Sequence, residues 1–443
     1  MGNDLRLHTK DLRKTILRTL LTAFLVAMIN QPVMAMMNDD DDDIKTAFTE
    51  NSSLQTGPAA EGKMVFDLNA SKAIGNLTPV AAFEGGIRYR AGAYDVIVLN
   101  GSYREMGRQY GALMKDELQS VHSIIESFSS ERGYSTEQIR EIGSKGCEYQ
   151  PERMKSIYEG MAETSGIAEE DVNVLYYGPV LFVALPNLTR ASCSFLAAWG
   201  NYTPDGTLVV SRNWDLPDVF LIFNPYYVLV IYNPTDGSNG VATFGPVGSR
   251  PETLMNSAGL LVADDNSGQS GGGLVLDNRP DIISQFFRLM LDYSTLEQLD
   301  AGIMSTRPDS SWIVNVAGPD KAYSYEMNLY ETKRREGPDL IAAANHFLDP
   351  TWHIEISDED SFRRYNNLLN LSEENKGSID ASKMMKIRDV LIEDGGATFL
   401  HYTMGDMNFS TNHQVVFVPQ TRILWMKTAE HPWQEVNLSS LFS

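Results

Sequence analysis

Cysteine is scarce in this chain, with only Cys147 and Cys193 among 443 residues. A framework of several disulfides, which small secreted domains use to support a small core, is therefore excluded. A single Cys147–Cys193 bridge is the most that can form. A chain of this length with 43% hydrophobic residues can bury a core large enough to fold without cross-links. Each cysteine is therefore open to another use.

Histidine is also scarce, and metal-ligand patterns are missing. The seven histidines show no metal-ligand spacing, and the two cysteines do not form a zinc-type pair. Gly101 to Gly111 lacks the Gly-Lys-Ser/Thr ending of a phosphate loop. We therefore expect no metal ion and no cofactor.

Basic side chains are too few for a nucleic-acid partner. The chain has 36 Lys and Arg against 58 Asp and Glu, a net charge of −22. Binding phosphates needs clustered Lys and Arg, so a nucleic-acid function is excluded. The acidity is better suited to keeping the protein soluble.

A hydrophobic run long enough to cross a membrane is missing too. The strongly apolar segment from Leu20 to Ile29 has ten residues, whereas a transmembrane helix needs roughly 20. Five basic residues precede it and Val33-Met34-Ala35 follows it, which is typical of a signal peptide. We therefore predict a signal peptide over residues 1–35 and an exported body in a periplasm, an extracellular space or a secretory lumen.

The alternative at this end of the chain is an uncleaved anchor, formed by residues 19–38 and in contact with a membrane. If residues 1–35 are removed, the net charge changes from −22 to −25. The polar residues 36–80, which include five aspartates at positions 39–43, are expected to form a linker.

In the rest of the chain, the pattern of predicted secondary structure changes near Cys193. Residues 81–192 are mainly helical in pattern, and residues 193–443 read as short strands with a few helices. Helices are predicted for residues 101–118, 121–128, 137–142, 151–164, 281–293 and 360–369. Strands are predicted for residues 91–99, 195–199, 208–211, 227–232, 241–244, 260–263, 311–316, 321–327, 414–418 and 423–427. Helices outside antiparallel strands predict a layered α+β sandwich.

The segment around Cys193 predicts a β-hairpin. Cys193 stands at the start of one strand, Pro204-Asp205-Gly206 forms a tight turn, and the returning strand ends in Arg212 and Asp215. Such a hairpin brings Arg212 and Asp215 back beside Cys193. The alternative is that Cys193 is a small buried hydrophobe, which is the commoner role of a lone cysteine.

The Cys193…Arg212-Asn213-x-Asp215 arrangement resembles that of the choloylglycine hydrolases and the related acyl-coenzyme A:6-aminopenicillanic-acid acyltransferase-like cysteine peptidases. Three further segments agree with this group in their order along the chain. They are residues 101–111 (GSYREMGRQYG), residues 256–260 (NSAGL) followed by Asn266, and Asn345-His346-Phe347 with residues 361–365 (SFRRY). The resemblance extends over about residues 95 to 430.

This resemblance implies a four-layer αββα fold of the N-terminal-nucleophile type and a precursor cut at the Ser192–Cys193 bond. Residues 81–192 are then a pro-segment or small subunit, and residues 193–443 the catalytic subunit. The cut would solve an activation problem, because a thiol is a poor nucleophile until it loses its proton. The new α-amino group, with an ordinary pKa of roughly 7.7 to 8.0, can accept that proton without a histidine.

The resemblance also implies roles for six residues, which are Cys193, Arg212, Asp215, Asn266, Asn345 and Arg364. Arg212 would favour the thiolate of Cys193, and Asp215 would hold the α-amino group. Asn266 and Asn345 would stabilise the oxyanion, and Arg364 would support the nucleophile. Arg363 competes with Arg364 for its role, and Ser194 stands where threonine often follows the nucleophile.

The predicted function is an exported amidohydrolase that cleaves a linear, non-peptide C–N bond of a small acyl-amide molecule through an acyl-enzyme. The resemblance allows acylated amino acids, acyl-homoserine lactones, conjugated bile acids and penicillin-like amides as substrates. An acyltransferase that uses the same acyl-enzyme is an alternative, as is a non-catalytic exported binding protein. A Cys–His hydrolase with His346 or His353 is a further alternative, and a homo-oligomer is open.

Overall fold

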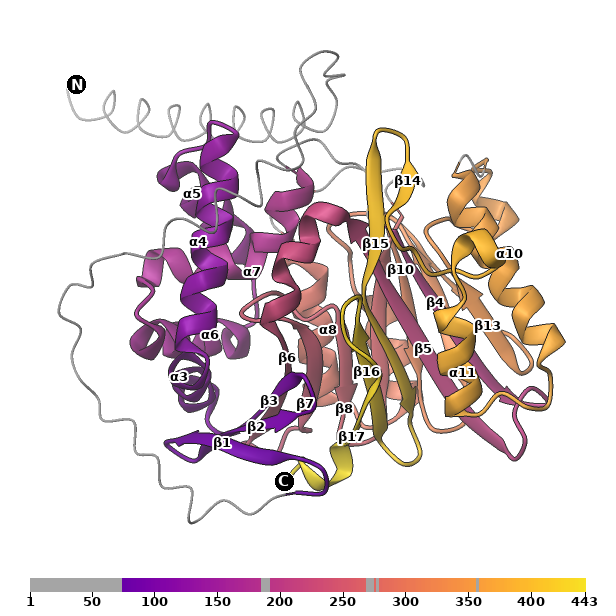
Figure 1. Ribbon diagram of the computed structural model, residues 1–443, viewed down its shortest axis with the longest axis horizontal. Helices are drawn as coiled ribbons and strands as arrows, with labels where there is room; N and C mark the ends of the chain where they lie inside the picture. The colour runs from indigo at the N-terminus through magenta and orange to yellow at the C-terminus, as the bar shows by residue number, and fades with distance from the viewer. Residues whose placement is uncertain (1–73, 185–191, 268–274, 276–278, 356–357) are drawn as a thin grey trace, which may run out of the picture. The chain divides into compact units, whose positions relative to one another are not determined.

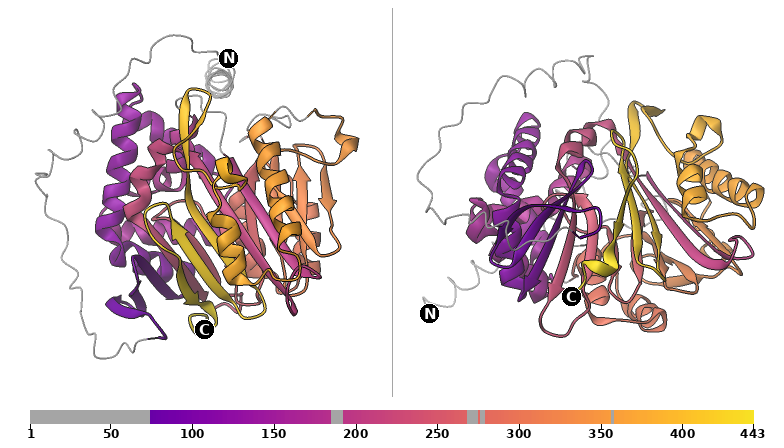
Figure 2. Two further views of the ribbon diagram at one scale, coloured as in Figure 1. Left: turned by 45° about the vertical axis from the view of Figure 1, so that its right-hand side comes forward. Right: turned by 60° about the horizontal axis from the view of Figure 1, so that its bottom comes forward.

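The computed structural model describes residues 74–184, 192–267, 275, 279–355 and 358–443. These residues all belong to one compact unit, Val65–Ser443. Two β-sheets lie between two layers of helices, as Figure 1 and the turned views in Figure 2 show. The predicted αββα arrangement is therefore confirmed. The predicted signal peptide and most of the predicted linker lie outside the described residues.

The first sheet has ten strands. In spatial order they are β1 (Thr78–Phe83), β2 (Gly86–Ala91), β3 (Tyr94–Gly101), β6 (Tyr227–Pro234), β7 (Val241–Pro246), β8 (Thr253–Asn256), β9 (Leu261–Asn266), β10 (Trp312–Ala317), β11 (Ala322–Met327) and β12 (Thr332–Arg335). Neighbouring strands are antiparallel except β3 and β6, which run parallel. Most residues of β3 and β6 are buried, as expected for strands covered on both faces.

The second sheet has seven strands and contains the predicted hairpin. Its order is β13 (Leu340–Ala343), β4 (Ser192–Gly200), β5 (Gly206–Pro217), β15 (Met407–Val418), β16 (Ile423–Thr428) and β17 (Gln434–Asn437), and β14 (Tyr402–Met404) pairs with β15. In the β4–β5 turn, the Thr207 backbone N–H donates to Asp205 Oδ1 over 3.0 Å. Gly206 takes a φ of 82°, a value that glycine adopts without strain. The turn residues recognised in the sequence thus set the hairpin.

Helices cover the outer faces of both sheets. Those on the side of the ten-stranded sheet are α3 (Tyr103–Leu113), α4 (Lys115–Glu131), α5 (Thr136–Cys147), α6 (Glu152–Ser165), α7 (Glu169–Ala184), α8 (Ile282–Asp292) and α9 (Leu296–Ser305). Helices α10 (Glu359–Glu374) and α11 (Ala381–Asp389) pack on β4, β5, β13 and β15. Short 3-10 helices are η2 (Asp218–Tyr226), η4 (Pro350–Trp352), η5 (Ile392–Asp394) and η6 (Leu438–Ser440). None of the helices in the described residues has the length and apolar character needed to cross a membrane.

The structure differs from the expected elements in two instructive places. The helix expected over residues 101–118 is two helices, because the chain breaks at Met114 between α3 and α4. Helix α7 was not expected at all. Its second half is nearly all apolar and contains Gly178 and Pro179, so it lacks the one-sided pattern by which a surface helix is recognised.

Helices α3 and α6 cross unusually closely because each has a glycine at the contact. A Cβ atom on Gly107 would lie 2.0 Å from the backbone oxygen of Ile157, and one on Gly160 would lie 2.1 Å from that of Arg104. These are backbone atoms, which cannot rotate away as the end of a side chain can. The pair of glycines therefore sets the distance between the two helices.

We expect Gly107→Ala and Gly160→Ala each to lower the free energy of unfolding by about 1–3 kcal/mol, the usual cost of overpacking. Alanine is the better helix former, so the added methyl group is the reason for the loss. Urea unfolding followed by circular dichroism measures it. Glu141→Ala, at an exposed position of α5, is the control and should change stability little. A stabilised Gly160→Ala would contradict the close crossing.

Candidate functional site

Cys193 is the second residue of β4, and the hairpin sets what lies around it. Cys193 is paired with Trp214 and Ser192 with Asp215 across the two strands. Arg212 and Asp215 are three positions apart on β5, and side chains alternate between the faces of a sheet. The two side chains therefore lie on opposite faces. Arg212 faces the ten-stranded sheet, and Asp215 faces α10.

Between the sheets, Arg212 is the polar partner of the cysteine sulfur. Its Nη2 lies 3.6 Å from Cys193 Sγ. Its Nη1 donates to Thr253 Oγ1 over 2.7 Å, and Nη2 also donates to the backbone oxygen of Asp264. The guanidinium is fully buried. Arg212 is thus fixed by β8 and β9 with its charge beside the sulfur.

Carboxylates surround this guanidinium. Glu252 Oε2 lies 3.6 Å from Arg212 Nη2, and Asp265 Oδ1 lies 3.7 Å from Arg212 Nε. Cys193 is only 2% exposed, and burial raises the pKa of its thiol well above the ordinary value. Arg212 opposes that rise, whereas Asp265, Asp215 and Glu252 add to it. The sulfur is therefore held as a protonated thiol at neutral pH.

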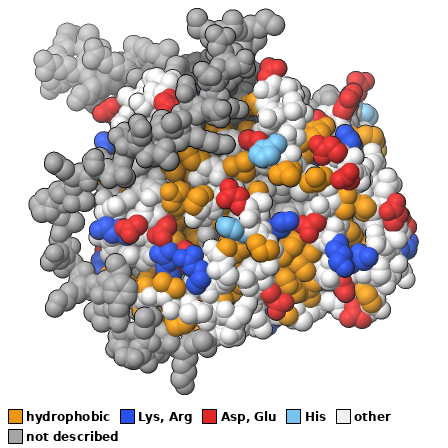
Figure 3. Space-filling view, viewed as in Figure 1, with side chains coloured by type: hydrophobic (Ala, Val, Ile, Leu, Met, Phe, Trp, Pro, Cys, Tyr) orange, Lys and Arg blue, Asp and Glu red, His pale blue; other side chains and the backbone are white. Residues whose placement is uncertain are grey.

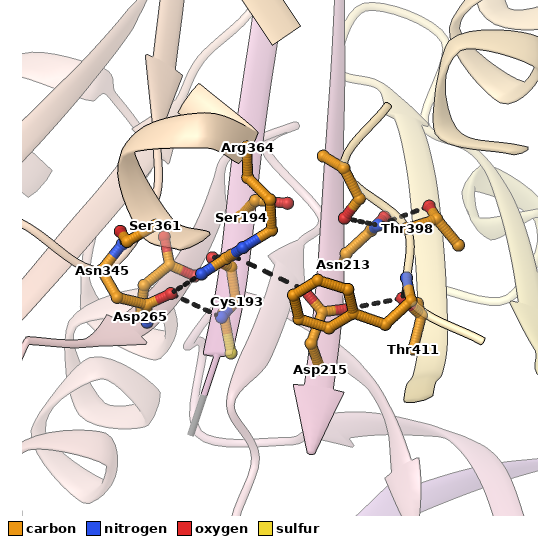
Figure 4. Close-up of polar contacts among 12 residues, drawn as sticks. Cys193, Ser194, Asn213, Asp215, Asp265, Asn345, Ser361, Arg364, Thr398 and Thr411 are labelled. Carbon is orange, nitrogen blue, oxygen red and sulfur yellow. Dashed lines mark hydrogen bonds and ion pairs between the residues drawn. The ribbon is translucent and has the colours of Figure 1, made fainter. Parts of the chain in front are cut away.

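Asn345 and Arg364 bind the main chain of Cys193 rather than its side chain, as Figure 4 shows. The backbone N–H of Cys193 donates to Asn345 Oδ1 over 2.9 Å. Arg364 Nη1 donates to the backbone oxygen of Cys193 over 2.5 Å, and its Nη2 donates to Asn345 Oδ1 over 2.8 Å. Asn345 Nδ2 donates to the backbone oxygen of Asn266 over 2.7 Å. Both polar main-chain atoms of the cysteine are therefore engaged.

Asp215 lies on the outer face of the second sheet, on the side of Cys193 that faces α10. Its Oδ1 accepts from Thr411 Oγ1 over 2.5 Å, and its Oδ2 lies 3.8 Å from Arg364 Nη1 (Figure 4). Complete burial raises the pKa of the Asp215 carboxyl to about 7, against the opposing effects of Arg364, Thr411 and Arg388. This carboxyl can therefore change its charge near neutral pH.

The structure brings all six predicted residues together. Direct contacts join Cys193 to Arg212, Asn345 and Arg364, and Arg364 to Asp215. Asn266 enters through its backbone oxygen. Of the two competing arginines, Arg364 reaches the cysteine, whereas Arg363 is exposed and donates to the backbone oxygen of Ile392 over 2.9 Å. The catalytic roles given to these residues stay predictions.

Sequence reasoning missed Arg388, which lies directly behind the site. This fully buried side chain of α11 donates from Nη1 to Ser194 Oγ over 2.8 Å and from Nε to Ser211 Oγ over 2.8 Å. Ser194 and Ser211 are the strand neighbours of Cys193 and Arg212. Burial lowers the pKa of Arg388 to about 9. Its only sequence signal is a charged residue on the apolar face of α11, beside Met384 and Ile387.

The two histidines of the Cys–His alternative serve other contacts. His346 Nδ1 lies 2.7 Å from Ser361 Oγ, and its ring packs near Phe362 and Tyr365. Burial is the main reason that the pKa of His346 falls to about 4. His353 is exposed after η4. The polar contact of Cys193 Sγ is to Arg212 rather than to either ring.

The remaining cysteine lies elsewhere. Cys147 and Cys193 are both free, so the single disulfide bridge considered above is wrong. Cys147 ends α5 and lines a cavity of about 460 Å³ between α5, α6 and α7, together with Lys155 and Tyr158. Cys193 does not line that cavity. The cavity and the Cys193 site are therefore separate features.

The described surface seen in Figure 3 carries acidic and basic side chains interspersed with one another, with apolar side chains between them. Within the described residues, no three His, Cys, Asp or Glu side chains form a cluster that could hold a metal ion.

The chain was compared with protein families, curated proteins and solved structures. No family model matches it. An uncharacterized protein of Archaeoglobus fulgidus (strain ATCC 49558) is 23% identical over an alignment of 344 residues, and the alignment covers 66% of this chain and 57% of that protein. The chain therefore spans little more than half the length of this relative.

Three solved structures are similar to parts of the chain. A variant of the conjugated bile acid hydrolase from Clostridium perfringens is 12% identical, with a TM-score of 0.41, over 56% of this chain and 92% of that one. The N-acylethanolamine-hydrolyzing acid amidase ortholog of Caenorhabditis elegans is 13% identical, with a TM-score of 0.36, over 51% and 93%. Penicillin V acylase from Agrobacterium tumefaciens is 11% identical, with a TM-score of 0.38, over 57% and 88%. Likenesses of this size leave the activity to be inferred from the site itself.

We expect Arg364→Met to lower the free energy of unfolding by about 3–5 kcal/mol, because it removes a buried cation that lies beside Asp215 and binds the Cys193 oxygen and Asn345 Oδ1. Arg363→Met should change it by no more than about 0.5 kcal/mol, since that side chain is at the surface. Denaturant unfolding of the two variants beside the wild type measures both values. Equal losses in the two variants would contradict the assignment of Arg364 to the site.

The raised pKa of Asp215 also predicts a pH dependence of stability. The carboxyl titrates at about 7 when folded and at about 3.9 when unfolded, so between these values the folded state binds more protons. The contribution of Asp215 to the free energy of unfolding is therefore present below about pH 4 and is lost as the pH rises through about 7. In a Cys193→Ala background, Asp215→Asn removes this loss. The stability of Asp215→Asn relative to its parent should then rise from pH 5 to pH 8, measured by urea unfolding, and a flat or falling difference would contradict it.

Proposed function

We propose that this protein is an exported amidohydrolase that cleaves the linear C–N bond of a small acyl amide, with Cys193 as an N-terminal nucleophile after self-cleavage of the Ser192–Cys193 bond. The observation that carries the proposal is the engagement of both main-chain polar atoms of Cys193 by side chains, the nitrogen by Asn345 and the oxygen by Arg364. Export rests on the sequence of residues 1–35 alone.

The sheet itself does not bind this nitrogen on the β13 side. Strand β13 pairs with residues Phe195 to Ala198 of β4 and ends at Ala343. Two residues further on, the side chain of Asn345 takes the place of the strand and accepts the Cys193 N–H. A side chain can follow a nitrogen that becomes a free amine, whereas a backbone ladder cannot adapt so easily. This arrangement suits a residue that becomes a chain terminus.

Self-cleavage would begin with the Cys193 thiol. The sulfur adds to the carbonyl carbon of Ser192, the C–N bond breaks, and the released amine takes a proton. The product is a thioester between the Ser192 acyl group and Cys193 Sγ. Water then hydrolyses the thioester to a Ser192 carboxylate and a Cys193 with free thiol and free amine. Arg212, 3.6 Å from the sulfur, would stabilise the thiolate that attacks.

Turnover of a substrate would reuse the same groups. The α-amine accepts the thiol proton, the thiolate attacks the amide carbonyl, and the C–N bond breaks as the proton passes to the leaving amine. Water then hydrolyses the thioester left on Cys193, which releases the carboxylate and restores the thiol. Asn345 Oδ1 would hold the α-amine as it holds the N–H of the uncut chain, and Asp215 would stabilise the ammonium form. Asn345 Nδ2 gives one N–H to Asn266, so its second N–H is the candidate oxyanion donor.

Self-cleavage gives the first test of this proposal. Purified wild-type protein should contain a fragment whose N-terminus is Cys193, seen by intact mass and N-terminal sequencing. Cys193→Ala should stay whole, because it lacks the attacking sulfur. Cys147→Ala is the matched control, since it removes the other buried cysteine and should be cut like the wild type.

A folded wild type that stays whole at every pH would refute the proposal. The cut protein should also release amine from linear acyl amides, and Cys193→Ala should release none. If an added acceptor amine captures the acyl group faster than water does, the acyl-enzyme is used for transfer rather than for hydrolysis.

A further inference from the structure

Glu252 stands just before β8, on the face of the site between the two sheets. Its side chain is 12% exposed. Its Oε1 accepts from Arg250 Nε over 2.9 Å, and its Oε2 accepts from Trp214 Nε1 over 2.6 Å. Oε2 also lies 3.6 Å from Arg212 Nη2. That nitrogen lies 3.6 Å from Cys193 Sγ as well.

One nitrogen of Arg212 therefore has two neighbours that compete for its charge. Thr253 Oγ1 and the backbone oxygen of Asp264 also bind this guanidinium, but both are neutral. The Asp265 carboxylate lies 3.7 Å away on the other side, at Nε. Glu252 is thus the carboxylate that approaches the same nitrogen as the sulfur does.

We propose that Glu252 is a positioning residue that shares the Arg212 guanidinium with the Cys193 sulfur and limits how far that sulfur is activated. This proposal rests on the proposed function of Cys193 as the nucleophile. Glu252 acts through Arg212 and is not required to touch the substrate. Because the negative charge of Glu252 offsets part of the positive charge of Arg212, Arg212 stabilises the Cys193 thiolate less.

Glu252 is itself held in place from the helical layer. Arg250, its partner, lies 3.5 Å from Asp281 Oδ1. Asp281 caps α8 by accepting from the backbone N–H of Ser284 over 3.0 Å, and it accepts from the hydroxyl of Tyr176 on α7. Charges of alternating sign therefore run from Arg212 through Glu252 and Arg250 to Asp281. This row and Trp214 fix the carboxylate, so it cannot swing away from Arg212.

Other titratable and charged groups lie around the Cys193 site, on both faces of the second sheet, and have to be kept constant in a test. They are Asp215 on β5, Tyr227 on β6, Asp264 and Asp265 on β9, His413 on β15, Arg364 on α10, Arg388 on α11 and Arg250 in the loop before β8. Burial lowers the pKa of His413 well below its ordinary value, so this ring stays neutral. A single change at Glu252 leaves all of these side chains in place.

Glu252→Gln removes the charge and keeps an oxygen that can accept from Trp214. Arg212 then gives more of its charge to the thiolate, so the pKa of the Cys193 thiol should fall by about one unit, a usual effect of a charge at this range. The rate of alkylation by iodoacetamide at about pH 8 should rise about tenfold, because the thiolate is the reacting form. Glu252→Asp keeps the charge and should return the rate towards that of the wild type.

The experiment uses the full chain with Cys147→Ala, so that Cys193 is the remaining thiol. Alkylation is followed by intact mass between about pH 6 and about pH 10, which brackets the ordinary thiol value of about 8.5. If Glu252 and the Cys193 sulfur share Arg212, the pH profile of the alkylation rate should move to lower pH in Glu252→Gln. An unmoved profile, or a faster alkylation that Glu252→Asp shows as well, would overturn it, since a rise that does not depend on the charge reports looser packing. Glu117→Gln, which breaks the distant pair with Arg88, should leave the profile unchanged.

Self-cleavage is measured on the same samples, and this separates the two proposals. If the chain stays whole but Glu252→Gln still moves the alkylation profile, the N-terminal-nucleophile function is refuted and the sharing of Arg212 is supported. If the chain is cut but Glu252→Gln does not move the profile, the sharing of Arg212 is refuted and the N-terminal-nucleophile function is supported.

Discussion

The carboxamide of Asn345 is the constraint on which the site depends. Its oxygen accepts from the Cys193 N–H and from Arg364, and its nitrogen donates to the backbone of Asn266. Its own backbone N–H donates to Ser361 Oγ at the start of α10. One side chain thus joins β4, β9 and α10, which belong to two sheets and an outer helix. A carboxamide can do this because it carries an acceptor and two donors on one rigid plane.

The alternation of side chains along β5 explains how opposite charges coexist around one cysteine. Arg212 and Asp215 are close in sequence and would neutralise each other on a helix face. On a strand, an odd spacing places them on opposite faces of the sheet. The cation then lies beside the sulfur, and the carboxyl lies beside the main chain and Arg364. The side chain and the main chain of Cys193 therefore lie in different electrostatic environments.

Local signals in the sequence predicted the β4–β5 hairpin, because Pro204-Asp205-Gly206 specifies a turn whatever surrounds it. The layered fold was also predictable, and motif resemblance selected six residues that the structure places together. The choice between Arg363 and Arg364 was not predictable, since adjacent helical residues differ only by about 100° of rotation, and tertiary packing decides which faces β4. Arg388 and Glu252 were missed for the same reason. Their partners lie in distant segments, and neither stands in a recognisable pattern.

The parallel pairing of β3 with β6 has a consequence for the newly made chain. A ribosome releases β3 long before β6, because α3 to α7 and the whole β4–β5 hairpin come between them. During that interval β3 has β2 on one side and an open edge on the other. An open, apolar edge invites pairing with other chains. The early helix α3, which packs directly on β3, covers its face but not this edge, so the half-made protein depends on how quickly synthesis reaches residue 234.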